Sequence, residues 1–270
     1  MASAVHSTTP PIGVFDSGIG GLTVVAELRK ALPSERILYV GDTARVPYGG
    51  KSQETVTRYA REISELLVGE RTKLIVVACN TASALALPSL ALGSAVPMIG
   101  VLEPGATAAV RATRSGKIGV IGTRATIGSD AYGKAIRRIN PSLDVTAVAC
   151  PLLVPLIEEG LFEDEITETL LRRYIDPMLR QGIDTLVLGC THYPLLKKTI
   201  GCICGDGVTL VDSAENCALA VKELLSGLPA TARDPRLDIL LTDSSEGFLR
   251  IAEKSLNLSI DSLEVRRVGS

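Results

Sequence analysis

The chain of 270 residues is long enough for one large domain or two of modest size. Hydrophobic residues make up 46% of it and aromatic residues only 3%, with no Trp, a composition that favours an α/β protein over a β-sandwich. The net charge of −2 and the lack of an apolar stretch long enough to span a bilayer give no reason to expect a nucleic-acid or membrane partner.

The chain begins with residues 1–11, which lack the basic and apolar regions of a signal peptide, so we expect a cytoplasmic protein. The first predicted strand, 12–15, leads through a glycine-rich turn, 16–21, into a helix beginning near Leu22. These glycines do not match the dinucleotide fingerprint, which leaves a tight strand-to-helix turn or an anion cradle. Asp16 is more informative, because it stands at the carboxyl end of a strand, where parallel sheets bind their ligands.

A second strand, 37–40, is followed by a polar loop, 41–50, that contains Pro-Tyr-Gly-Gly. The loop is either a surface turn or a binding loop, because loops at this end of a sheet commonly carry binding residues. Ser52 can cap the next helix, whose apolar face predicts packing on the sheet.

The third strand is the apolar run 74–78, which delivers Cys79, Asn80 and Thr81 at its carboxyl end. An unbroken apolar run of this length is typical of a strand buried on both faces of a parallel sheet. Pro88 predicts a break in the following helix. After a fourth strand, 98–101, the segment Glu103-Pro-Gly105 is the expected crossing between two lobes.

The pattern then restarts. The strand 118–123 resembles the first one at an offset of 106 residues, and the strand 185–189 delivers Cys190, which follows Cys79 by 111 residues. These repeats predict two similar flavodoxin-like or Rossmann-like α/β lobes with parallel-rich sheets and an active site in the cleft between them. The pattern leaves open which lobe takes the last predicted elements: strands at 209–211, 237–241 and 263–268, and a helix at 213–226.

Six cysteines in a cytoplasmic chain should be reduced. Cys150, Cys202, Cys204 and Cys217 are interpreted as small buried apolar residues. The Cys and His spacings match no zinc site, so no metal is expected.

Two thiols delivered by equivalent strands suggest an acid and a base acting on opposite faces of one carbon. A thiolate removes a proton from one side and a thiol returns one from the other, which inverts a stereocentre without a second substrate. Each cysteine then needs a neighbour that tunes its protonation, and Asp16 and His192 are the candidates for Cys79 and Cys190. The alternative is a non-catalytic ligand-binding module in which both cysteines are core residues.

Four short motifs occur in order along the chain: Phe15-Asp-Ser-Gly18, Val46-Pro-Tyr-Gly49, Ala78-Cys-Asn-Thr-Ala-Ser83 and Gly189-Cys-Thr-His-Tyr-Pro-Leu195. Together they closely resemble the cofactor-independent aspartate/glutamate racemase family, from about Ile12 to about Leu225.

The resemblance implies roles for individual residues. Cys79 and Cys190 match the two acid/base thiols, with Asp16 and His192 as assisting groups and Glu158 as a further acidic residue near the second thiol. The matching substrate-binding positions are Asp16, Ser17, Tyr48, Gly49, Asn80, Thr81, Thr123, Thr126, Thr191 and His192. The family fold implies a first lobe of residues 1–101 plus 214–270, a second lobe of residues 102–213, and a homodimer.

The implied reaction is racemisation of L-glutamate and D-glutamate without a cofactor, which would supply D-glutamate for peptidoglycan synthesis. A related two-thiol racemase acting on aspartate or a hydantoin is the alternative. The matched positions include no Lys or Arg, so amides and hydroxyls are expected to hold the substrate carboxylates, while Arg45 is either a contributor or a structural residue. Pyridoxal phosphate is not implied, because no matched motif contains a lysine.

Overall fold

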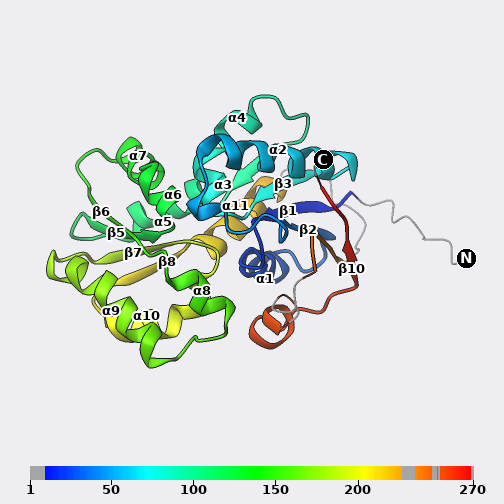
Figure 1. Cartoon of the computed structure of the whole chain (residues 1–270). Helices are drawn as coiled ribbons and strands as arrows, with labels where there is room; N and C mark the ends of the chain where they lie inside the picture. The colour runs from blue at the N-terminus through cyan, green and yellow to red at the C-terminus, as the bar shows by residue number, and fades with distance from the viewer. Residues whose placement is uncertain (1–9, 227–234, 245–247, 249, 269–270) are drawn as a thin grey trace, which may run out of the picture.

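The computed structural model describes residues 10–226, 235–244, 248 and 250–268 and contains two parallel β-sheets side by side, each covered by helices (Figure 1). The predicted α/β class with two lobes is therefore confirmed. Among these residues no helix is both long and apolar enough to cross a membrane.

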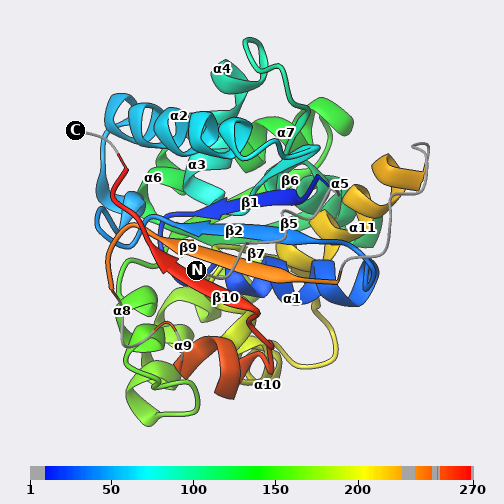
Figure 2. The same ribbon diagram turned by 90° about the vertical axis from the view of Figure 1, so that its right-hand side faces the viewer.

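The first sheet has six strands in the order β10-β9-β2-β1-β3-β4, and every pairing is parallel (Figure 2). Its strands are β1 (Ile12–Asp16), β2 (Ile37–Gly41), β3 (Leu74–Val77), β4 (Met98–Gly100), β9 (Leu237–Leu241) and β10 (Ser262–Val265). Strands β9 and β10, the last two in the sequence, thus extend the first sheet on the side of β2.

The second sheet has four strands in the order β6-β5-β7-β8, again all parallel. Its strands are β5 (Lys117–Gly122), β6 (Asp144–Ala149), β7 (Thr185–Gly189) and β8 (Thr209–Asp212). This order repeats the order β2-β1-β3-β4 of the first sheet, so the recurrence in the sequence corresponds to two lobes with the same strand arrangement.

The central strands β1, β3 and β7 are buried along their whole length, as their apolar runs predict. In the first lobe α1 (Leu22–Ala31) and α2 (Gln53–Gly69) cover opposite faces of the sheet (Figure 2). The helices that follow β4 are α5 (Leu102–Ala112), α6 (Arg124–Gly128), α7 (Ala131–Ile139), α8 (Leu153–Glu158), α9 (Glu165–Arg180) and α10 (Lys197–Cys204).

The expected break at Pro88 is present, because α3 (Asn80–Leu85) ends before α4 (Leu87–Ala91), in which Pro88 lies in the first turn. The segment Glu103-Pro-Gly105, the expected crossing between the lobes, forms the first turn of α5, which connects β4 of the first sheet to β5 of the second. A proline is tolerated there because the first turn of a helix leaves its N–H groups unbonded.

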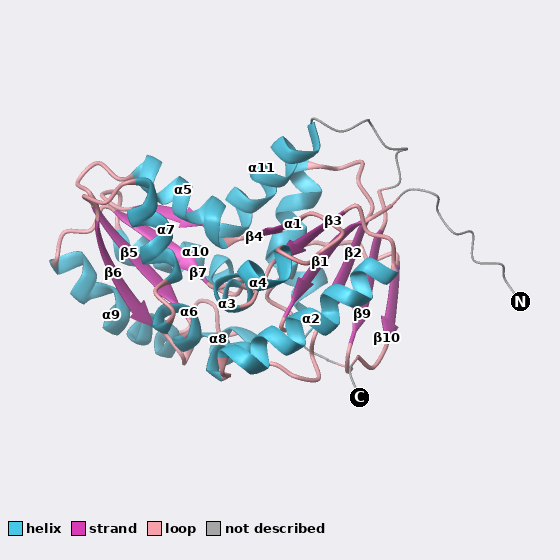
Figure 3. Ribbon diagram, turned by 90° about the horizontal axis from the view of Figure 1, so that it is seen from above, coloured by secondary structure: helices cyan, strands magenta, loops and turns pink. Residues whose placement is uncertain are grey.

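Helix α11 (Ser213–Ser226) lies between the two sheets (Figure 3). It packs against α1 on one side and α5 on the other, so one element contacts both lobes. Three further short segments are a 3-10 turn at Tyr48–Gly50, another at Tyr193–Leu196, and a π-helical segment at Arg250–Ser255.

Candidate active site

The carboxyl ends of both sheets open into one cavity of about 320 Å³. It is lined by Ser17 after β1, Cys79 after β3, Thr123 after β5, Cys150 after β6 and Cys190 after β7. Eleven of the thirteen residues expected in the site line this cavity: Ser17, Tyr48, Gly49, Cys79, Asn80, Thr81, Thr123, Glu158, Cys190, Thr191 and His192.

Asp16 and Thr126 are the two that do not line it, and both are buried directly behind it. One Asp16 oxygen accepts a hydrogen bond from the Gly18 N–H at 3.0 Å, and the other accepts one from the Thr191 hydroxyl at 3.3 Å. Burial raises the pKa of Asp16, while the nearby His192 charge opposes that rise. Asp16 therefore links the first lobe to the loop that carries the second thiol.

The first thiol, Cys79, sits at the N-terminal boundary of α3 and is 5% exposed. Its Sγ donates to the Ser17 hydroxyl at 3.7 Å. Burial, followed by the charge of Asp16, raises the pKa of Cys79 to about 12. These surroundings favour the protonated thiol at this position.

The second thiol, Cys190, has a different surrounding. Its Sγ lies 3.8 Å from Nδ1 of His192, whose Nε2 is 3.1 Å from Oε1 of Glu158. Burial alone would lower the pKa of His192, but its contacts with Cys190 and Glu158 outweigh burial and raise the pKa to about 10. A protonated imidazole therefore lies beside the Cys190 sulfur and can exchange a proton with it.

The Pro-Tyr-Gly loop is held by a buried carboxylate. The Tyr48 hydroxyl donates to Asp42, which also accepts from Arg45 at 2.7 Å and from Thr242 at 2.9 Å. Arg45 pairs with Glu62 as well and lies over the Tyr59 ring, 4.2 Å from its centre. Arg45 is therefore a structural residue that fixes this loop, and Tyr48 presents its ring rather than a free hydroxyl to the cavity.

Hydroxyl and amide groups join the two lobes across the cavity floor. The hydroxyls of Thr81, Thr123 and Thr126 lie within 2.9 to 3.2 Å of one another. The Asn80 side chain accepts from the Tyr132 hydroxyl at 2.6 Å and lies 3.5 Å from the Ser213 hydroxyl. The Asn80 side chain therefore forms hydrogen bonds between the two lobes.

Two glycines allow the lobes to approach this closely. A Cβ at Gly20 would lie 2.4 Å from Nδ1 of His192 and from the Thr191 hydroxyl oxygen. A Cβ at Gly49 would lie 2.7 Å from Cβ of Thr123. Both distances are far shorter than van der Waals contact, so a side chain at either position would push the second lobe away.

Several lining residues were missed by the sequence analysis: Gly50, Arg124, Cys150, Pro151, Val154 and Pro155. Arg124 is the most informative, because it brings an exposed cation to a cavity whose matched positions include no Lys or Arg. Arg124 could have been predicted from sequence as a site residue, because it follows the carboxyl end of β5 at the start of α6.

The other cysteines match their interpretation only in part. Cys150 and Cys217 are buried, and burial raises the pKa of each to about 12. Cys202 is exposed and Cys204 is partly exposed, so the interpretation as buried residues was wrong for these two. Both lie on α10, where Cys202 is on the face of the helix exposed to solvent, while Ile200 and Ile203 are on the buried face.

The arrangement supports proton transfer at a carbon placed between two thiols. Cys79 comes from the first lobe and Cys190 from the second, and each has its own polar neighbours. Such a pair can act as acid and base in alternation.

Comparisons with known proteins agree with this chemistry. A family model for Asp/Glu/Hydantoin racemase matches residues 20–221. A relative named glutamate racemase from Geobacter metallireducens is 54% identical over 248 residues, which cover 91% of this chain and 92% of the relative.

Two solved structures are also similar. A glutamate racemase isoform from Bacillus anthracis aligns with a TM-score of 0.91 and 41% identity, covering 95% of this chain and 97% of that one. A glutamate racemase from Francisella tularensis in complex with D-glutamate aligns with a TM-score of 0.89 and 37% identity, covering 96% and 97%. The present chain therefore belongs to the Asp/Glu/hydantoin racemase family.

Proposed function

We propose that this protein interconverts L-glutamate and D-glutamate without a cofactor and supplies D-glutamate for peptidoglycan synthesis. The observation that carries the proposal is the pair of thiols, Cys79 and Cys190, brought to one cavity by equivalent strands of two lobes. Relatives that match more than nine-tenths of this chain are named glutamate racemase, which supports the choice of substrate.

In the proposed reaction one cysteine thiolate takes the α-proton, and the electrons of the broken C–H bond delocalise into the α-carboxylate. The other cysteine thiol then gives its proton to the opposite face of the carbon. The enzyme is left with thiol and thiolate exchanged, ready for the reverse reaction. Because the two thiols come from different lobes, each can reach only one face.

The neighbours of each thiol suggest how it is tuned. For Cys190, the neighbour is His192, which is held by Glu158 and lies close enough to exchange a proton with the sulfur. For Cys79, burial and then the negative charge of Asp16 raise the pKa and oppose ionisation. The α-ammonium group of a bound amino acid brings a positive charge that offsets Asp16, so substrate binding should lower the pKa of Cys79.

Substrate recognition is proposed to use the lining hydroxyls of Ser17, Thr81, Thr123 and Thr191, with Arg124 attracting a carboxylate at the cavity edge. Asn80, Thr126 and Tyr48 are proposed to shape the site through their contacts, with Gly49 leaving room for Thr123.

Aspartate or a hydantoin is the alternative substrate class. Aspartate is one methylene shorter than glutamate, and one methylene is worth only about 1–3 kcal/mol in a binding site. We expect glutamate to be preferred in kcat/KM, and similar values for the two amino acids would place the protein among broader racemases.

The division into lobes of residues 1–101 plus 214–270 and residues 102–213, a cytoplasmic location and a homodimer are also part of the proposal. Membership of β9 and β10 in the first sheet supports the division. The homodimer is proposed from the resemblance to the racemase family alone. Sedimentation of the purified protein as a monomer at micromolar concentration would exclude the dimer.

The direct test is to follow the circular dichroism of D-glutamate with the purified protein after exhaustive dialysis against a chelator. Loss of the signal without added cofactor is the expected result. Strict dependence on pyridoxal phosphate or on a divalent ion would rule out the two-thiol reaction.

A further inference from the structure

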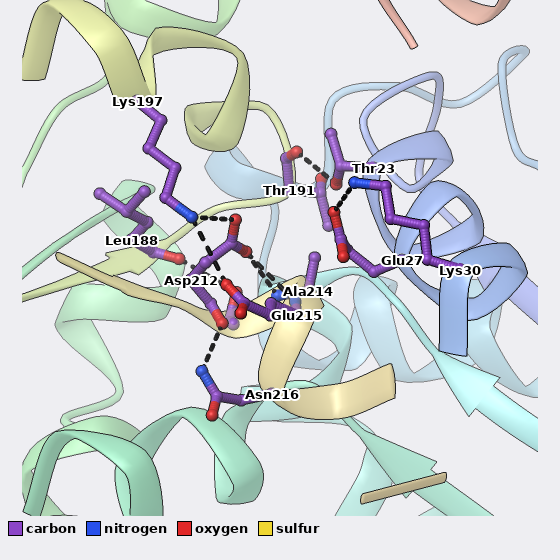
Figure 4. Close-up of polar contacts among 11 residues, drawn as sticks. Thr23, Glu27, Lys30, Leu188, Thr191, Lys197, Asp212, Ala214, Glu215 and Asn216 are labelled. Atoms are coloured by element: carbon purple, nitrogen blue, oxygen red, sulfur yellow. Dashed lines mark hydrogen bonds and ion pairs between the residues drawn. The ribbon is translucent and has the colours of Figure 1, made fainter. Parts of the chain in front are cut away.

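The hydroxyl of Thr23 forms a buried contact between the lobes beside the active-site loop. Thr23 lies in the first turn of α1 and is 3% exposed, and its Oγ1 is 2.9 Å from the carbonyl oxygen of Thr191 (Figure 4). Thr191 stands between Cys190 and His192, and its side chain reaches back to Asp16. The contact thus joins α1 of the first lobe to the loop that carries the second thiol.

The local sequence explains why this carbonyl needs a distant donor. In the tight turn after β7, the Tyr193 N–H donates to the Cys190 carbonyl and the Leu195 N–H to the His192 carbonyl, each at 3.1 Å. The same three-residue spacing would pair the Thr191 carbonyl with residue 194, which is a proline and has no N–H. The Thr23 hydroxyl supplies the bond that Pro194 cannot.

The Thr23 hydroxyl has a second acceptor nearby, the Gly20 carbonyl at 3.0 Å. A hydroxyl has one proton to donate. The Gly20 carbonyl already accepts the Thr23 backbone N–H at 3.0 Å, whereas the Thr191 carbonyl depends on the hydroxyl. Donation to Thr191 therefore leaves fewer buried groups unsatisfied.

We propose that Thr23 is a positioning residue for the racemisation, resting on the function proposed above. It holds the Thr191 carbonyl and so sets where Cys190 lies relative to Cys79 and Asp16. Small displacements of a reacting group have large kinetic effects, and about 1 Å can cost two orders of magnitude in rate.

Thr23 also lines a second cavity of about 400 Å³, and this cavity determines which substitutions of Thr23 are informative. Its charged groups are paired: Lys30 with Glu27 at 2.7 Å, and Lys197 with Asp212 at 3.5 Å (Figure 4). Because Thr23 lines this cavity and contacts the Thr191 carbonyl, we expect its truncation to alanine to let water from the cavity reach that carbonyl. Substitution by valine keeps the volume and offers no donor, so Thr23→Val should be more harmful than Thr23→Ala.

The experiment compares Thr23→Val, Thr23→Ala and Thr23→Ser with the wild-type protein in both directions of racemisation. We expect kcat to fall about ten- to a hundredfold in Thr23→Val, with a smaller change in KM, and to return toward wild type in Thr23→Ser. The primary deuterium isotope effect should rise for the enantiomer whose α-proton Cys190 removes and stay constant for the other. A variant that is only less stable would lower the active fraction and leave both isotope effects unchanged.

Thr72→Val is the matched control, because Thr72 is also buried and donates to a backbone carbonyl, that of Leu67, at 3.0 Å. It should lose stability without changing the isotope effects. Wild-type kcat and isotope effects in Thr23→Val, or no recovery in Thr23→Ser, would overturn the proposal.

Amide hydrogen exchange separates this proposal from the proposed function. If the wild-type protein does not racemise glutamate, the function is wrong, yet Thr23 can still be tested by the exchange rates of residues 191–196. Faster exchange in Thr23→Val than in Thr72→Val supports the contact, and equal rates would refute it. If Thr23→Val does not fold, the same comparison is made with Thr23→Ala and Thr23→Ser.

Discussion

Cys79 and Cys190 share one cavity but differ in what surrounds their sulfur atoms. Cys79 faces a serine hydroxyl and a buried carboxylate, whereas Cys190 faces a histidine held by Glu158. A reversible racemase does not need two identical thiols, because each one starts the reaction in only one direction. The asymmetry should therefore appear in the two directions of turnover.

Replacement of either cysteine by serine tests the two-thiol chemistry. A serine hydroxyl is a far weaker acid than a thiol, and its alkoxide is scarcely available near neutral pH. We expect Cys79→Ser and Cys190→Ser to lose racemisation by orders of magnitude in both directions, with little change in unfolding temperature. Cys217→Ser is the control, since Cys217 is equally buried but lies outside the cavity. Near-normal turnover in either site variant would show that the replaced cysteine has only a packing role.

The raised pKa of His192 predicts how the stability of the fold depends on pH. The pKa of His192 is about 10 in the folded protein and near 6.5 in an unfolded chain. The folded state therefore binds more protons between these values, so the contribution of His192 to stability is fully present below pH 6.5 and is lost as pH rises through about 10.

His192→Asn should make the urea midpoint depend less on pH across that window, and Glu158→Gln should act in the same direction by lowering the pKa of His192. Urea titrations at pH 6.5 and pH 9.5 measure the effect. An unchanged difference between the two midpoints in His192→Asn would show that other groups cause the alkaline loss.

Among the elements, the glycine-rich turn before α1 decides how closely the second lobe can dock. Because a Cβ at Gly20 would overlap His192 and Thr191, Gly20→Ala should displace the loop of Cys190 and lower kcat/KM by at least tenfold. Gly69→Ala is the matched control, since a Cβ there meets no atom within 4 Å among the described residues. Equal kcat/KM in the two variants would mean that the turn tolerates a side chain.

The strands and the residues at their ends could be predicted from sequence because they follow from local patterns. The runs before Asp16, Cys79 and Cys190 are apolar and short, and the ends of parallel strands meet at one edge of a sheet. The contacts of Thr23 with Thr191 and of Asn80 with Tyr132 could not be predicted in this way. They depend on how α1, α11 and α5 pack against one another across the two lobes, which no local pattern encodes.

At the scale of the whole molecule, the net charge of −2 opposes the approach of glutamate, which carries one net negative charge near neutral pH. Arg124 offsets this electrostatic repulsion near the site, because it is an exposed cation at the edge of the cavity. Within the described part of the chain, the cavity lining contains one other charged side chain besides the histidine, Glu158, which is held by His192. Arg124 should therefore speed capture of the substrate more than the proton transfer itself.

Arg124→Gln should raise KM for glutamate several-fold with little change in kcat, because the cation acts before the chemical step. The dependence of kcat/KM on ionic strength should also weaken, since salt screens the attraction that the substitution removes. Arg111→Gln removes the same charge from an exposed position on α5 that does not line the cavity, and it should leave both KM and the salt dependence unchanged. Steady-state kinetics at low and high salt distinguish the two variants. Equal salt dependence in both would show that the charge of the whole surface, and not Arg124, guides the substrate.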